Sequence, residues 1–339
     1  MNKENNSVLM NGKPVYTVPA KTVLNMKSDF AHKLLCDGIT INPGSACVYR
    51  CSYCYVESMM NKNALVQQVK EQSGLPFKDV AVRRENAVGI LKKQLTDRYG
   101  QSKFFEPTDR RTVFISTTVD PAGNMELARE TAEICNVVLD LTNWQIRLLS
   151  KSPLLIKIAD AIPEKWRHRI IYGFSTGTLN DGIARSIEVG TPLVSKRIAA
   201  LHELQNRGLR TYGMMCPILP QENAAVYAQQ VAQRLHLKHC EHVWAEVLNV
   251  RGASMKKTCD ALRAAGQERP AKLLEAVSND RELHEQYSRE TFLALSEVIP
   301  AGKLRFLQYV RKDTRNWRVA HEHRGAVLLG KSAKGEIKI

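Results

Sequence analysis

Three cysteines stand close together in one short stretch of the chain. Cys47, Cys51 and Cys54 follow the spacing C-x3-C-x2-C, with a tyrosine directly before the third cysteine. Three thiolates on one tight loop can each bind one iron of a [4Fe–4S] cluster and leave the fourth iron without a protein ligand, whereas electron-transfer clusters are closed by four cysteines. An iron with an open position can bind a small molecule and promote a reaction on it. The spacing therefore predicts a catalytic iron-sulfur site.

Other uses of the three cysteines fit the sequence less well. A structural zinc site normally takes four ligands in two pairs, and the flanking cysteines, Cys36 and Cys135, do not supply a second pair. Disulfides are disfavoured because residues 1–21 carry no secretory signal. Together with Cys240 and Cys259, the two flanking cysteines are expected to lie in the core or at the surface.

Strand-like and helix-like segments alternate along the chain. Apolar or β-branched runs that end in polar or glycine-rich turns predict strands at 38–42, 112–117, 145–150, 170–175, 210–217 and 242–247. Amphipathic segments predict helices at 125–139, 154–161, 196–206 and 224–235. The alternation implies an α/β fold with parallel strands and helical crossovers. Six such units fit a partial (β/α)6 barrel of the TIM type, whose active-site loops follow the carboxyl ends of the strands. The cysteine loop follows the first strand.

The sequence also suggests three regions along the chain. They are an N-terminal extension (1–36), the partial barrel (37–250) and a helical, basic C-terminal region (251–339). The stretch 55–111 is long for a single crossover and is expected to pack outside the barrel, with an amphipathic helix at 85–98. Residues 303–310 predict a late strand.

The charge of the chain predicts a polyanionic partner. Lys plus Arg number 49 against 34 Asp plus Glu, a net charge of +15. The excess is strongest at 301–339, where ten cations face Asp313, Glu322 and Glu336, with Trp317 among them: Lys303, Arg305, Arg311, Lys312, Arg315, Arg318, Arg324, Lys331, Lys334 and Lys338. Contact with DNA or RNA is one interpretation, and a solvated basic tail is the other. Without a run long enough to cross a membrane, the protein is expected to be cytoplasmic and to have no membrane partner.

Short motifs then follow one another over residues 20–251. In order they are AKTVLN (20–25), TINP (40–43), the cysteine stretch (47–55), STTVDP (116–121), LSKSP (149–153), FSTGT (174–178), EVGTP (188–192) with Arg197, and CPILP (216–220). In combination they resemble the spore photoproduct lyase-like group of radical SAM proteins, often labelled DNA repair photolyases.

The resemblance implies an enzyme that reductively cleaves S-adenosylmethionine (SAM) at a [4Fe–4S] cluster, which generates a 5′-deoxyadenosyl radical for hydrogen abstraction. It makes Cys47, Cys51 and Cys54 the cluster ligands and places Tyr53 near the adenine. The residues that it places around the amino and carboxylate groups of SAM are Thr117, Thr118, Lys151 and Ser175. A lysine at a strand end can pair with that carboxylate, or it can be an ordinary surface residue. The hydroxyls can instead cap the following helices.

One position departs from the family pattern. The lyase that gives the group its name carries a cysteine in the second-strand loop that returns a hydrogen atom to the repaired thymine, and this chain has Thr117 there. That difference puts thymine-dimer repair in doubt. Tyr53 and Tyr55 match the tyrosines that are linked to radical return in the lyase. Cys216, at the end of the fifth strand, is a candidate substitute donor, although such a cysteine is often a core residue.

Three function classes therefore remain open. The first is a radical SAM enzyme, lyase-like or modifying, that acts on nucleic acid and receives its electron from a partner such as flavodoxin or ferredoxin. The second is a radical SAM enzyme that modifies a peptide or protein partner. The third is a nucleic-acid-binding protein with a non-catalytic cluster. The motifs that match the SAM-holding loops of the family argue against this third class.

Overall fold

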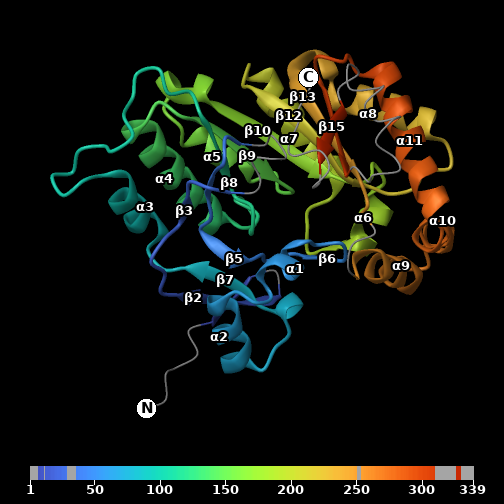
Figure 1. Cartoon of the computed structure of the whole chain (residues 1–339), viewed down its shortest axis with the longest axis horizontal. Coiled ribbons are helices and arrows are strands. Elements are labelled where there is room, and N and C mark those ends of the chain that lie inside the picture. The colour runs from blue at the N-terminus through green and yellow to red at the C-terminus, as the bar shows by residue number, and fades with distance from the viewer. Residues whose placement is uncertain (1–6, 11, 29–35, 250–252, 310–325, 330–339) are drawn as a thin grey trace. The chain divides into compact units, whose positions relative to one another are not determined.

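A computed structural model of the chain describes residues 7–10, 12–28, 36–249, 253–309 and 326–329 (Figure 1). The chain packs as two compact units. Unit 1 comprises residues 1–50 and 54–171, and unit 2 comprises residues 51–53 and 172–339. The loop from Cys47 to Cys54, called the cysteine loop below, contributes its two ends to unit 1 and its middle to unit 2.

Unit 1 contains the first three strands that the sequence predicts. β4 (Ile39–Ile41), β8 (Thr112–Ile115) and β9 (Gln145–Ser150) pair in parallel in that order, and β3 (Leu24–Asn25) pairs antiparallel with β4. All three side chains of β4 are buried, while those of β9 alternate between buried and partly exposed positions. The helices near these strands are α3 (Ala87–Leu95), α4 (Met125–Leu141), α5 (Leu155–Asp160) and the short 3-10 helix η3 (Glu164–Arg169).

A second, smaller sheet of unit 1 is absent from the sequence prediction. Its strands pair in the order β1 (Ser7–Met10), β2 (Lys13–Val18), β7 (Ala81–Arg84) and β5 (Gly44–Ala46). β2 and β7 are parallel, and the outer pairs are antiparallel. The helices α1 (Val56–Met60), α2 (Ala64–Ser73) and η2 (Phe77–Asp79) lie in the chain between β5 and β7.

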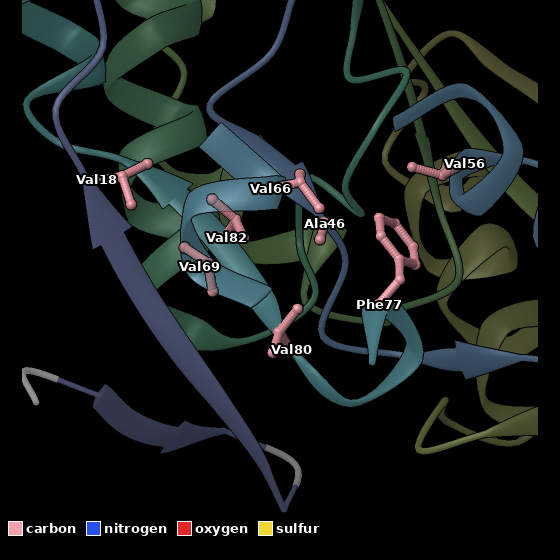
Figure 2. Packing of buried hydrophobic residues seen from close by; sticks show 8 residues of the cluster. All are labelled: Val18, Ala46, Val56, Val66, Val69, Phe77, Val80 and Val82. Atoms are coloured by element: carbon pink, nitrogen blue, oxygen red, sulfur yellow. The ribbon is translucent and has the colours of Figure 1, made fainter. Parts of the chain in front are cut away.

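A hydrophobic core fills the space between this sheet and its helices. Figure 2 shows its eight side chains, which we call the small-sheet core: Val18, Ala46, Val56, Val66, Val69, Phe77, Val80 and Val82. Fully burying a valine or phenylalanine side chain stabilises a fold by about 1.5 to 3 kcal/mol. Ala46 directly precedes the cysteine loop and Val56 follows it by two residues, so this core fixes both ends of the loop.

Unit 2 contains the remaining parallel strands. They pair in the order β10 (Ile170–Thr176), β12 (Thr211–Ile218), β13 (Cys240–Val247), β14 (Leu304–Tyr309) and β15 (Ala326–Leu329), with the first two residues of β10 assigned to unit 1. The helices are α6 (Asp181–Ile187), α7 (Val194–Asn206), α8 (Ala224–Leu235), η4 (Leu237–His239), α9 (Ser254–Ala264), α10 (Glu268–Asn279) and α11 (Arg281–Val298). A two-stranded sheet joins β11 (Glu188–Val189) to β6 (Arg50–Cys51).

Polar caps start many of the helices close to the strand-end loops. In α4, for example, the Asn124 side chain accepts a hydrogen bond from the Leu127 amide at 2.8 Å, which satisfies a backbone group that the first helical turn leaves free. Equivalent caps are Asn63 of α2, Asn86 of α3, Asn180 of α6, Asn223 of α8 and Asp280 of α11.

The structure confirms the predicted α/β fold with mainly parallel strands. Each predicted strand matches an observed one, namely β4, β8, β9, β10, β12 and β13, and the late strand is β14. Among the described residues, the paired strands of each unit do not close into a ring. Within residues 55–111, β7 belongs to the separate small sheet. The helix predicted at 85–98 is observed as α3. The predicted region boundaries at 37 and 251 stay a prediction.

The basic end of the chain is described only in part. Lys303 donates from Nζ to the carbonyl of Leu237 at 2.5 Å, and Arg305, largely buried, donates to the carbonyl of Leu304 at 2.7 Å. These two cations therefore support unit 2. The other eight cations of the predicted basic segment, together with Trp317, lie outside the described residues. Within the described part, no helix combines the length and the apolar character needed to cross a bilayer.

Candidate functional site

Two of the three loop cysteines, Cys47 and Cys54, belong to unit 1. As whole residues both are partly exposed, and Cys54 packs against the small-sheet core. Burial raises the pKa of the Cys47 thiol to about 11, and the nearby carboxylate of Asp120 adds to this rise. Burial also raises the pKa of Cys54, while the ammonium groups of Lys151 and Lys13 oppose it. Without a bound cation, both thiols are therefore protonated at neutral pH.

The loop after β8 lies beside β4, and Asn42 holds it there. The Asn42 Oδ1 atom accepts hydrogen bonds from the backbone amides of Thr117 at 2.7 Å and Thr118 at 3.2 Å. The Thr118 hydroxyl donates to the carbonyl of Gly44 at 2.6 Å. Tyr55 is about half exposed, and its hydroxyl donates to the carbonyl of Thr117 at 2.7 Å. Three of the predicted site residues, Thr117, Thr118 and Tyr55, are thus neighbours.

The end of β9 is tied to the same loop by Asp120. Its carboxylate accepts hydrogen bonds from the Ser150 hydroxyl at 2.6 Å and from the Lys151 backbone amide at 2.7 Å. Burial raises the pKa of Asp120, and both of these hydrogen bonds oppose the rise. The positive charge of Lys151 acts on both Asp120 and Cys54. The structure therefore places the predicted Lys151 close to one of the predicted cluster ligands.

The middle of the cysteine loop, Cys51 to Tyr53, is anchored in unit 2. The Ser52 amide donates to the carbonyl of Ile187 at 2.8 Å, and the hydroxyls of Ser52 and Thr258 lie 3.0 Å apart. The Tyr53 hydroxyl donates to the carboxylate of Glu188. Burial raises the pKa of Tyr53 well above its ordinary value, and the adjacent Glu188 carboxylate adds to the rise.

Glu188 is in turn paired with a buried arginine. The guanidinium of Arg197 lies 2.5 Å from the Glu188 carboxylate, and both side chains are essentially inaccessible. Arg197 also donates to the carbonyls of Pro192 and Ser175, at 2.9 Å each. The chain Tyr53, Glu188, Arg197, Ser175 therefore connects the cysteine loop to the end of β10 within unit 2.

Cys216 lies near the carboxyl end of β12 and is the one side chain of that strand that is not fully buried. Its Sγ donates to the Glu246 carboxylate of the neighbouring β13 at 3.5 Å. The Ser175 hydroxyl donates to the carbonyl of Cys216 at 3.4 Å. A Cβ atom at Gly177 would lie 1.7 Å from the carbonyl oxygen of Pro217, so only glycine allows the loop after β10 to approach the end of β12 this closely. The candidate donor thus adjoins Ser175.

The donor chemistry of the cysteine loop fits an iron-sulfur cluster. All eight cysteines are free, and the three of the loop are partly exposed while Cys36, Cys135, Cys240 and Cys259 are buried, as expected for core residues. Three free cysteines on one loop are the ligands that such a cluster takes. Across the residues that the structure describes, no three His, Cys, Asp or Glu side chains gather to hold a single metal ion.

The residues that the sequence singled out fall into two groups. Unit 1 brings together Cys47, Cys54, Tyr55, Thr117, Thr118 and Lys151, and unit 2 contains Cys51, Tyr53, Ser175 and Cys216. Sequence reasoning missed Asn42, Asp120, Glu246 and Lys13. Asn42 and Asp120 stand inside quoted motifs, which was a usable signal. Glu246 and Lys13 carried none.

Comparison with solved structures identifies the fold. A spore photoproduct lyase variant with bound AdoMet and dinucleoside spore photoproduct superposes with a TM-score of 0.57 and 12% sequence identity, covering 86% of this chain and 81% of that one. Spore photoproduct lyase complexed with dinucleoside spore photoproduct gives a TM-score of 0.56 at 14% identity, covering 86% and 82%. This chain has the fold of spore photoproduct lyase. The predicted resemblance is confirmed at the level of the fold.

Comparison of sequences finds relatives that are described as uncharacterized proteins. Protein ORF301 of Acidianus two-tailed virus is 23% identical over 275 residues, which cover 80% of this chain and 83% of that protein. Protein Rv2578c of Mycobacterium tuberculosis is 23% identical over 184 residues, 54% of this chain and 50% of that protein. The match therefore spans only half of the mycobacterial relative. No protein-family model matches the chain.

Proposed function

We propose that this chain is a radical SAM enzyme that acts on a nucleic acid. The observation that carries the proposal is the place of the cysteine loop, which follows β4, the first parallel strand, in a fold shared with spore photoproduct lyase. Active-site loops of barrels built from such units follow the carboxyl ends of the strands. When bound, a [4Fe–4S] cluster with SAM supplies a 5′-deoxyadenosyl radical, which abstracts a hydrogen atom from the substrate.

In this proposal the side chains bind and orient, as is usual where a cofactor carries the reaction. Cys47, Cys51 and Cys54 hold the cluster. Lys151 pairs with the carboxylate of SAM, and its existing proximity to Cys54 supports that role. The remaining contacts to SAM are assigned to Tyr53, Thr117, Thr118 and Ser175. Asn42 and Asp120 position the two loops that carry Thr117, Thr118 and Lys151.

We assign the return of a hydrogen atom to the substrate to Cys216, with Tyr55 as a second candidate. Cys216 is partly exposed at a strand end, and its thiol donates to Glu246. In the step itself the S–H bond of Cys216 breaks, a C–H bond forms on the substrate radical, and a sulfur-centred radical remains.

The donor assignment has a direct isotopic test. A thiol proton exchanges with solvent, so the reaction in D2O should place one deuterium on the product carbon. Cys216→Ala should abolish this label, while the buried Cys259→Ala should leave it unchanged. A label that survives in Cys216→Ala and disappears in Tyr55→Phe would move the assignment to Tyr55.

The nucleic-acid substrate is supported by the net charge of +15. The deciding experiment is anaerobic reconstitution with iron and sulfide, followed by dithionite and SAM, and measurement of 5′-deoxyadenosine with DNA, RNA or protein added. Stimulation by DNA or RNA is expected. Stimulation by protein alone would favour the peptide-modifying class, and SAM binding that is absent altogether would favour a non-catalytic cluster. Flavodoxin or ferredoxin, in a reducing cytoplasm, is the proposed source of the electron.

A further inference from the structure

Lys13 is a buried lysine beneath the cysteine loop. Its side chain is 2% exposed, and its Nζ atom donates to the carbonyl of Cys47 at 2.6 Å and, more weakly, to that of Tyr49 at 3.4 Å. Lysine is almost never fully buried unless it is paired, because removing a charge from water is costly. Such a burial at the start of β2 therefore requires an explanation.

The chain at the start of β2 and the cysteine loop each donate a hydrogen bond to the other. Arg50, at the far side of the same loop segment, donates to the carbonyl of Gly12 at 2.9 Å, and its guanidinium lies 3.3 Å from the carboxylate of Asp79. In the part of the chain that the structure describes, Lys13 itself forms no ion pair, and both of its acceptors are backbone carbonyls. Burial lowers the pKa of Lys13, and the nearby Cys47 and Cys54 oppose this lowering.

A buried cation with only neutral acceptors is suited to an anion that the loop will hold. A [4Fe–4S] cluster with three thiolates is anionic in its oxidised form, and each added electron increases the negative charge. A nearby positive charge stabilises the more negative state most, and charge and hydrogen bonding around a cluster set its reduction potential.

We infer that Lys13 is a positioning residue of the iron-sulfur site, which fixes the backbone of Cys47 and Tyr49 and supplies positive charge that favours one-electron reduction of the bound cluster. The inference rests on the proposed function. It gives the N-terminal small sheet a role in the chemistry, since β2 carries this lysine to the loop.

Two variants of the full chain distinguish the effect of the lysine's charge and hydrogen-bond donor from the effect of its size. Lys13→Met keeps the length of the side chain but removes the donor and the charge, whereas Lys13→Arg keeps both. Lys93→Met, an exposed lysine on α3 of the same unit, is the matched control. Thermal denaturation confirms that each variant is folded, and Lys13→Gln, which removes the charge but keeps a polar side chain, replaces Lys13→Met in both measurements if Lys13→Met does not fold.

The first readout is made on the protein without cluster. Hydrogen exchange of the peptide that covers residues 44–56 should become about tenfold faster in Lys13→Met, as expected for a lost hydrogen bond from a charged donor. Lys13→Arg and Lys93→Met should exchange like the parent chain. Equal exchange in all four proteins would overturn the positioning role.

The second readout is the midpoint potential of the reconstituted cluster. In Lys13→Met it should fall by an amount equivalent to about a tenfold change in the reduction equilibrium, about 59 mV for one electron, and Lys13→Arg should recover most of it. An unchanged potential in Lys13→Met overturns the charge role. If even the parent chain takes up no cluster, the proposed function fails, while the exchange result still decides whether Lys13 positions the loop.

Discussion

The two ends of the cysteine loop and its middle are held by different kinds of interaction. In unit 1, apolar packing of Ala46 and Val56 and one buried lysine fix the residues around Cys47 and Cys54. In unit 2, a buried acid and base, Glu188 and Arg197, hold Tyr53 beyond Cys51. Apolar cores tolerate gradual change, whereas a buried ion pair is disrupted by the loss of either partner. The comparison indicates that the middle of the loop is the part more sensitive to single substitutions.

The largest effect is expected at Cys51, the proposed cluster ligand that belongs to unit 2. Cys51→Ala should abolish both the electron paramagnetic signal of the reduced cluster and SAM cleavage, because one iron loses its thiolate. Cys259→Ala, a buried cysteine of the same unit, should leave both intact. A full cluster signal in Cys51→Ala would contradict the assignment of this residue and of the loop.

The next largest effect is expected at the ion pair. Arg197→Met leaves the Glu188 carboxylate buried without the guanidinium that balances its charge, and it should lower the free energy of unfolding in urea by about 3 to 5 kcal/mol. The double variant Glu188→Gln, Arg197→Met removes the stranded charge and should recover part of that loss. If the double variant were less stable than Arg197→Met, the pair would not be the source of the effect.

A substitution of Lys151 tests the proposed SAM contacts in unit 1 and leaves the small-sheet core unchanged. Lys151→Ala should weaken SAM binding by roughly tenfold or more, because a charge-assisted hydrogen bond of about 1.5 to 3 kcal/mol is lost. Equilibrium binding of SAM to the reconstituted protein measures it. Unchanged affinity would return Lys151 to the role of an ordinary lysine at a strand end.

The small-sheet core should respond more mildly than the ion pair. Val66 is completely buried, and Val66→Ala should cost about 2 kcal/mol of unfolding free energy from the lost methyl groups and the cavity they leave. Urea unfolding of Val66→Ala and Arg197→Met side by side tests the comparison directly. A larger loss in Val66→Ala would reverse it.

The smallest effect on the cysteine loop is expected from substitutions in the basic segment, which lies outside the described residues. Neutralising Arg311, Lys312, Arg315 and Arg318 together should flatten the slope of log K against log salt for DNA or RNA binding by about three units, since each phosphate contact contributes about 0.7 to 0.9. SAM binding should not change. A salt slope equal to that of the parent chain would favour a peptide or protein substrate.

The main fold was predictable because its signals are local. Strands such as β10 and helices such as α8 extend over seven or more residues, with apolar patterns that a single sequence displays. The small sheet was not predictable for the opposite reason. β5 has three residues, and β2 pairs with β7 across more than sixty residues of chain, so neither strand length nor proximity in sequence indicates it.

The candidate site shows the same division. Motif spacing indicated Cys47, the family resemblance indicated Lys151, and the position of Cys216 at the end of a predicted strand made it a candidate donor. Lys13 was overlooked because lysine is normally a surface residue and nothing adjacent to it in the sequence marks burial. Glu246 was overlooked because only the parallel pairing of β12 with β13 brings it next to Cys216.

The position of β2 has a practical consequence for anyone who shortens this protein at its N-terminus. Deleting residues 1–18 would remove β1 and β2 and turn β7 into an unprotected edge of the sheet, with Val80 and Val82 newly uncovered. Exposed edges of this kind recruit strands from other molecules. Such a truncated chain is expected to collect in inclusion bodies, and under the proposed function any refolded fraction should take up less iron than the intact chain.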